Sequence, residues 1–162
     1  MRIRRIVAGF DAGACRPETL QAIAALAAET QAELLGLFIE DTGLLDLARL
    51  PFAAEVGYPS AARRGLDVET LERALRVRAE TLRRALAAAL EPAAVKWTFR
   101  TERGYPADTL ATALAEGHAP ALLIPPGGKP HAAREVVRRP DLNEALLRAL
   151  IAAARPVLIL PE

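Results

Sequence analysis

Short apolar runs alternate with helical stripes along this chain, and that alternation constrains the fold more than any other feature of the sequence. An apolar run over residues 3–10 precedes a helical pattern over residues 17–30, and a second apolar run at residues 34–39 follows after only a few residues. Two parallel strands joined by a right-handed crossover helix have this order of elements. The sequence therefore predicts a β-α-β unit and a parallel sheet.

The alternation continues to the last residues. Asp67 is a typical N-cap for the long helical stripe that follows it, and residues 95–99 alternate apolar and polar side chains, as in a strand near a sheet edge. A helix ending near Gly117, a strand at 121–124, a helix over 141–154 and a strand at 156–160 complete the series. We therefore predict one domain over residues 1–162, a three-layer α/β fold with helices on both faces of an open sheet of five mostly parallel strands.

The segment between the second strand and the long helix is less regular. Leu44 to Tyr58 contains a short amphipathic stretch, then prolines and glycines. We interpret it as a satellite cluster packed on the sheet edge, with a lid over a ligand crevice as the alternative.

Charge, cysteine content and hydropathy exclude several classes of protein. A formal net charge of +1 disfavours generic nucleic-acid binding, which requires a clearly basic surface. No apolar stretch approaches the ~20 residues that span a membrane, and Cys15 is the single cysteine, which fits a reducing compartment. His118 and His131 have no carboxylate or cysteine at ligand spacing. We expect a cytoplasmic protein without a metal site.

Three strand ends provide candidate ligand-binding residues. In an open parallel sheet, ligands bind beyond the carboxyl ends of the strands, where the strand order reverses. The relevant turns are Asp11-Ala12-Gly13, Ile39-Glu40-Asp41 and Gly127-Gly128-Lys129. Asp11 is either a ligand or simply a turn former. Cys15 lies two residues before the first helix, where a thiol is either acidified or inert.

Several of these features together resemble the universal stress protein family over nearly the whole chain. They are the strand ending at Asp11, the long helix before the Trp97 strand, the Arg103-Gly104 turn, the Gly127-Gly128 pair and the closing helix and apolar strand. The resemblance implies the strand order 3-2-1-4-5 of an adenine nucleotide alpha hydrolase-like fold. It also implies a homodimer through the last strand, Val157 to Leu160.

The resemblance also implies where a nucleotide would bind. In members that bind ATP, the adenine lies near an aspartate that ends the first strand. Asp11 matches that aspartate, so the resemblance implies that Asp11, the adjacent Ala12 and Ile39, which lies near the base pocket, would bind the nucleotide. A glycine loop of the form G-x-x-G, nine residues, G-[ST] surrounds the phosphates, and here it would begin at Gly127, followed by Gly128 and Lys129.

The phosphate loop of this chain departs from that pattern. The second glycine is replaced by Pro130, and the third falls at Pro140 by strict spacing or near Asn143 when counted back from the last strand. Proline has no N–H to donate to a phosphate. Asp141 and Glu144 also place carboxylates where a helix N-terminus would attract an anion. We therefore expect weak ATP binding or none.

Residues 127–140 carry a feature that points the other way. Lys129, Arg134, Arg138 and Arg139 stand against Glu135, a local charge of +3. This loop either closes over an anion with its side chains or is simply a solvated surface loop.

Two functions remain open at this point. The first is a non-enzymatic, homodimeric stress-response or regulatory module with a degenerate nucleotide pocket and no cofactor. The alternative is a sensor of ATP or another adenine nucleotide that uses Asp11 and the basic loop. The chain has no G-x-G-x-x-G, P-loop or G-x-S-x-G motif, which disfavours the usual dinucleotide-binding proteins and hydrolases. It also lacks the S-G-G-x-D-S and H-x-G-H signatures of nucleotide-dependent enzymes on a related fold, so we expect no enzyme.

Overall fold

The computed structural model describes residues 4–13, 15–52, 54–57, 62–65, 67–116 and 121–124. Within them the chain forms these elements in order: β1 (Arg5–Phe10), α1 (Pro17–Thr30), β2 (Glu33–Asp41), α2 (Thr42–Ala48), β3 (Ala54–Gly57), β4 (Ala62–Gly65), α3 (Val68–Leu90), the 3₁₀ helix η1 (Glu91–Ala93), β5 (Trp97–Gly104), α4 (Pro106–Ala115) and β6 (Ala121–Ile124).

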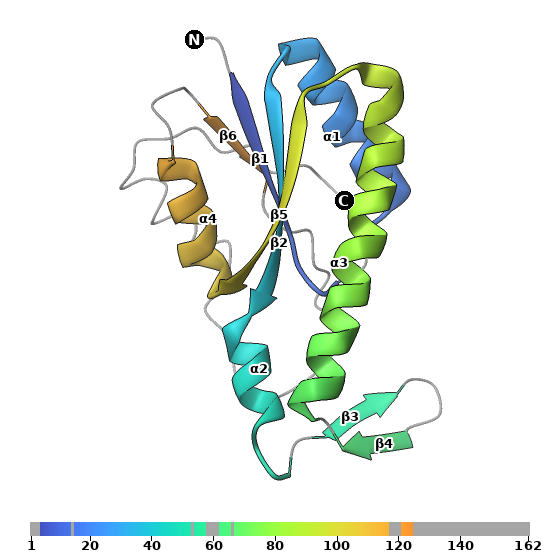
Figure 1. Ribbon diagram of the computed structural model, residues 1–162, viewed down its shortest axis with the longest axis vertical. Coiled ribbons are helices and arrows are strands. Elements are labelled where there is room, and N and C mark those ends of the chain that lie inside the picture. Colours follow the sequence, from blue (N-terminus) through green and yellow to red (C-terminus); the bar gives the residue numbers. More distant parts are fainter. Residues whose placement is uncertain are drawn as a thin grey trace.

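The main sheet has the predicted topology. Its strand order is β5-β2-β1-β6, and every neighbouring pair is parallel (Figure 1). This confirms the α/β fold class and corresponds to the predicted order 3-2-1-4 for the first four strands. The predicted last helix and the strand Val157 to Leu160 lie outside the described residues. None of the described helices is long and apolar enough to cross a membrane.

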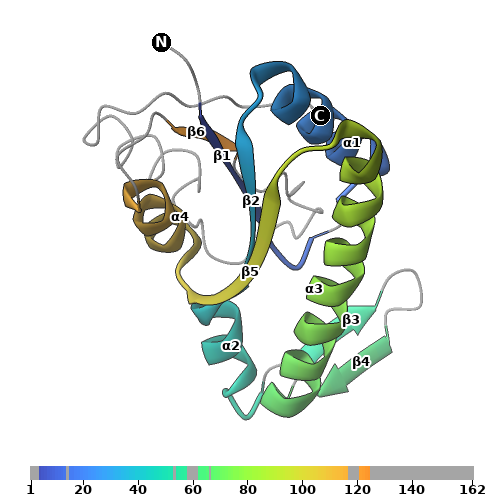
Figure 2. The ribbon, with the colours of Figure 1, turned by 45° about the horizontal axis from the view of Figure 1, so that its top comes forward.

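Helices cover both faces of the sheet, because successive residues of the central strands point to opposite sides. On β1, Ile6, Ala8 and Phe10 pack with α1 and α3, whereas Val7 packs with α4. Figures 1 and 2 show α1 and α3 on one side of the sheet and α4 on the other. The central strands β1 and β2 are buried along almost their whole length, which explains their continuous apolar sequences.

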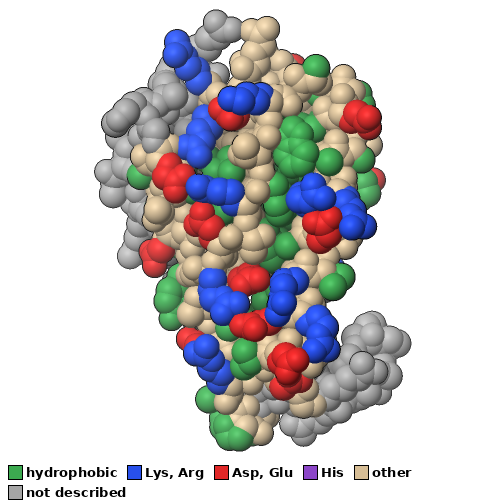
Figure 3. Space-filling view, in the orientation of Figure 1, with side chains coloured by type: hydrophobic (Ala, Val, Ile, Leu, Met, Phe, Trp, Pro, Cys, Tyr) green, Lys and Arg blue, Asp and Glu red, His purple; other side chains and the backbone are tan. Residues whose placement is uncertain are grey.

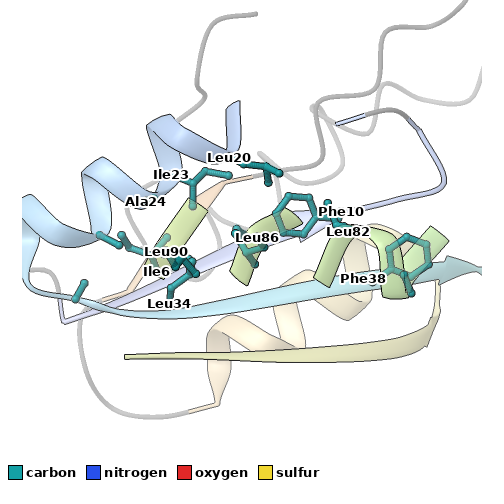
Figure 4. Close-up of a cluster of buried hydrophobic side chains, with 14 of the residues drawn as sticks. Ile6, Phe10, Leu20, Ile23, Ala24, Leu34, Phe38, Leu82, Leu86 and Leu90 are labelled. Carbon is teal, nitrogen blue, oxygen red and sulfur yellow. The ribbon is translucent and has the colours of Figure 1, made fainter. Parts of the chain in front are cut away.

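The larger hydrophobic cluster lies between the sheet and α3. The predicted stripe on α3 is confirmed: Leu71 is partly buried and Leu75, Leu82, Leu86 and Leu90 are buried. Figure 4 shows Leu82, Leu86 and Leu90 in this cluster. The predicted N-cap is confirmed as well, because a side-chain oxygen of Asp67 accepts a hydrogen bond from the N–H of Thr70 at 2.9 Å. The N-cap and the buried leucines thus hold α3 against the sheet.

The extent of β5 and a hairpin in the irregular segment differ from the sequence prediction. The strand predicted at residues 95–99 runs from Trp97 to Gly104, because the chain continues its pairing with β2 through charged residues. In the described part of the segment predicted as a satellite cluster, Leu45 and Ala48 of α2 are buried, whereas Leu47, Leu50 and Phe52 are exposed. The antiparallel hairpin β3-β4 was not predicted, because its strands have only four residues each, too few for a clear period.

Candidate functional site

The carboxyl ends of β1, β2 and β5 lie at the edge of the sheet where the ligand site is predicted. Phe10, the last residue of β1, is level with Phe38 of β2, so β2 and β5 continue beyond β1. Glu40 lies opposite Arg103 there. The strand order reverses between β1 and β6, as the predicted site requires. Gly127, Gly128 and Lys129 lie outside the described residues, so their predicted role stays a prediction.

The turn after β1 is closed by the side chain of Asp11. Its Oδ1 accepts a hydrogen bond from the N–H of Gly13 at 2.7 Å. Asp11 is half-buried, and Ala12 and Gly13 are exposed. An aspartate that bonds its own backbone two residues on is a turn former. Its role as a nucleotide ligand, and that of Ala12, stay predictions.

The carboxylate of Asp11 also influences the only cysteine of the chain. Burial raises the pKa of the Cys15 thiol, and the negative charge of Asp11 raises it further. A raised pKa lowers the fraction of thiolate at neutral pH, and thiolate is the nucleophilic form. The environment of Cys15 therefore favours the inert interpretation over the acidified one.

Ile39 lies in the hydrophobic core on the α4 side of the sheet. Its side chain is fully buried in the cluster that includes Val7, Leu110 and Leu114. This position comes from the strand alternation, which turns Ile39 away from α3. The contact between Ile39 and a nucleotide base, which the resemblance implies, stays a prediction.

A charged network that the sequence analysis missed joins three elements at this edge of the sheet. Oε2 of Glu40 accepts hydrogen bonds from Nε and Nη2 of Arg103, at 3.1 and 2.9 Å. The same Nη2 lies 2.9 Å from Oε1 of Glu72 on α3. Glu40 is only 8% exposed, and a buried carboxylate needs a partner of opposite charge. Arg103 provides that charge. The hydrogen bond to Glu40, followed by that to Glu72, raises the pKa of the Arg103 guanidinium.

The turn after this network requires a glycine. A Cβ on Gly104 would lie 2.5 Å from Oγ1 of Thr109, closer than real Cβ contacts. The close approach lets β5 pass directly into α4, which begins at Pro106. The Arg103-Gly104 turn therefore combines an ion pair with tight packing.

A shallow hollow of about 350 Å³ lies on the molecule's surface between α3 and β5, and we call it the α3-β5 groove. Its lining residues are Arg76, Ala79, Glu80, Arg83, Phe99 and Thr101. It is built from the flank of a helix and an edge strand and does not include the turn at Asp11. Across the described ranges, no three His, Cys, Asp or Glu side chains lie close enough together to hold a metal ion.

Solved structures of universal stress proteins have the same fold as this chain. The protein UspA from Lactobacillus plantarum matches with a TM-score of 0.61 and 15% identity, over 99% of each chain. A universal stress protein in complex with cAMP matches with a TM-score of 0.56 and 17% identity, over 99% of this chain and 98% of that chain. A solved structure of another description, that of the hypothetical protein MJ0577, matches with a TM-score of 0.69 and 13% identity, over 100% of this chain and 98% of that chain. No family model and no curated protein sequence matches this chain.

Proposed function

We propose that this chain is a divergent universal stress protein that acts as a non-enzymatic, homodimeric regulatory module, and that its nucleotide pocket no longer holds a triphosphate. The observation that carries the proposal is the state of the carboxyl edge. The N–H of Gly13, a donor that an anion could use, already donates to Asp11, and the Asp41 side chain likewise accepts from Gly43 N–H. The carboxylates of Asp11 and Asp41 are thus used in hydrogen bonds that close local turns.

The sequence of the phosphate loop supports the same proposal. Pro130 and Pro140 occupy positions where the resemblance implies glycine, so the loop has fewer N–H donors for phosphate oxygens. A triphosphate held by backbone N–H groups depends on those donors. Their loss and the acidic residues Asp141 and Glu144 weaken the attraction for an anion.

Calorimetric titration with ATP tests this proposal. We expect no saturable heat up to ~1 mM ATP, which corresponds to less than about 4 kcal/mol of binding free energy. The same samples should release no phosphate above a protein-free control. Saturable micromolar binding that Asp11→Ala abolishes and Asp46→Ala leaves intact would contradict the degenerate pocket. Asp46 is a suitable control because it is an exposed carboxylate of α2, ion-paired with Arg49.

The second candidate function is a sensor of an adenine nucleotide. The universal stress protein solved with cAMP, whose fold this chain has, favours it. A monophosphate or cyclic nucleotide needs fewer phosphate donors than ATP, and the basic residues of loop 127–140 could supply them. Titration with AMP and cAMP alongside ATP separates the two functions, because the degenerate module should bind none of them.

The homodimer is the part of the proposal that concerns partners. The predicted strand Val157 to Leu160 is apolar and would otherwise leave a free sheet edge, which favours pairing with a second copy. Light scattering at high micromolar concentration should give at least the mass of a dimer. A monomer under these conditions would remove this part of the proposal.

A further inference from the structure

The outer edge of β5 is unpaired within the described part of the chain. There, β5 pairs with β2 and with no other strand. The N–H of Leu34 in β2 donates to the carbonyl of Lys96 at 3.0 Å, so the main-chain groups of Trp97, Phe99, Thr101 and Arg103 point away from β2. Such a row of free donors and acceptors is a template for another strand.

The side chains of β5 divide between two faces. Phe99 and Thr101 line the α3-β5 groove. Arg100 points to the opposite side, where its Nη2 lies 2.9 Å from Oε2 of Glu116 at the end of α4 and 3.2 Å from Oε1 of Glu102. Figure 3 shows basic and acidic side chains interspersed over the face of the molecule that it presents. Arg100 and Glu102 thus share one face, two residues apart.

We propose that the edge of β5 binds a second copy of this chain, strand against antiparallel strand, about a two-fold axis at Thr101. In this register Arg100 of each copy lies opposite Glu102 of the other, so both charged pairs are attractive. Thr101 would exchange its outward main-chain hydrogen bonds with its own counterpart. The Arg100 and Glu102 pairs are then the non-hydrogen-bonded ones, in which opposing side chains lie closest.

Charge complementarity selects a second copy as the partner. An arginine and a glutamate spaced by one residue form a sequence that is its own complement when the strand is reversed. The contact is isologous, and it uses the opposite edge of the sheet from β6, so it is independent of the proposed dimer through residues 157–160. Charged side chains on edge strands also serve to prevent pairing, and this is the rival explanation that the experiment must separate.

A pair of charge-reversal variants tests the proposal. Arg100→Glu gives an edge with two carboxylates, and Glu102→Arg gives an edge with two guanidinium groups. In a copy-to-copy contact each variant places like charges opposite each other, so we expect each to have a clearly lower light-scattering mass than the wild type at ~100 µM, no larger than that of a dimer. An equimolar mixture should regain the wild-type mass, because the two edges are then complementary.

The mixture distinguishes an intermolecular contact from an internal one. Within either variant the side chains at 100 and 102 repel each other, so the pairing inside one chain cannot account for a gain of mass on mixing. The control pair is Arg16→Glu and Glu29→Arg, which make the same charge changes at exposed positions near the two ends of α1. Each control variant should keep the wild-type mass, and mixing the two should change nothing.

Two results would overturn the proposal. One is a wild-type mass in either edge variant, and the other is a mixture whose mass is the mean of its components. Thr101→Pro provides a variant without a charge change: the N–H it removes points outward, so the pairing with β2 is kept while the edge is blocked. It should also lower the mass to that of a dimer or less. Circular dichroism checks that every variant is folded.

Discussion

Replacing Leu86 with alanine should lower the free energy of unfolding by about 2–5 kcal/mol, the range for deleting a fully buried leucine side chain. Leu86 is 0% exposed and lies in the middle of the cluster between α3 and the sheet (Figure 4). Urea unfolding followed by circular dichroism measures the change, and the midpoint should fall without a change in slope. A cavity in a close-packed core explains the size of the effect.

The matched control lies on the same helix. Val77 is 63% exposed, so Val77→Ala removes little buried apolar surface and should change the stability by less than about 0.5 kcal/mol. An effect of Leu86→Ala as small as that of Val77→Ala would mean that α3 does not hold the core as described.

A second substitution tests how closely α3 approaches the sheet at this point. A Cβ on Gly36 of β2 would lie 2.9 Å from Cδ2 of Leu86 and 2.9 Å from Cδ2 of Phe99, so Gly36→Ala overpacks the core and should cost about 1–3 kcal/mol. The cost should be smaller when Leu86 is already alanine, since one of the two clashes is then absent. Additive effects would show that the two residues do not share this space.

The sequence predicted the architecture because the apolar periodicity follows local geometry. The alternation of residues such as Val7 and Ala8 on β1, and the leucines of α3, depend only on the period of a strand or helix. The N-cap at Asp67 is local in the same sense. The extent of β5 was missed, because Arg100, Glu102 and Arg103 are charged and the pairing with β2 that keeps them in a strand is not local.

The candidate site was predictable only in part, for the same reason. The turn at Asp11 is encoded within three residues, and its hydrogen bond to Gly13 agrees with the turn-former interpretation. The network of Glu40, Arg103 and Glu72 joins residues far apart in the sequence, 63 positions in the case of Glu40 and Arg103. Its partners became recognisable only once the register of β2 and β5 was known. A charged residue at the end of an apolar strand was the sole signal.

Removing the guanidinium of that network should be the other strongly destabilising change. Arg103→Met leaves the carboxylate of Glu40, which is 8% exposed, without the group that compensates its charge. Losing one partner of a fully buried pair costs about 3–5 kcal/mol, but the side chain of Arg103 is 48% exposed, so solvent screening reduces the expected loss to about 1–3 kcal/mol. Urea unfolding at neutral pH measures it.

Two further variants identify the cause of that loss. Arg73→Met is a control on the same helix as Glu72, because it breaks an exposed ion pair between Arg73 and Glu69. It should lower the free energy of unfolding by less than about 1 kcal/mol. Glu40→Gln combined with Arg103→Met removes the uncompensated charge and should recover most of the stability, since an amide is far cheaper to bury than a lone carboxylate. If the double variant were as unstable as Arg103→Met alone, the packing of the arginine side chain, and not its charge, would hold the ends of β2, β5 and α3 together.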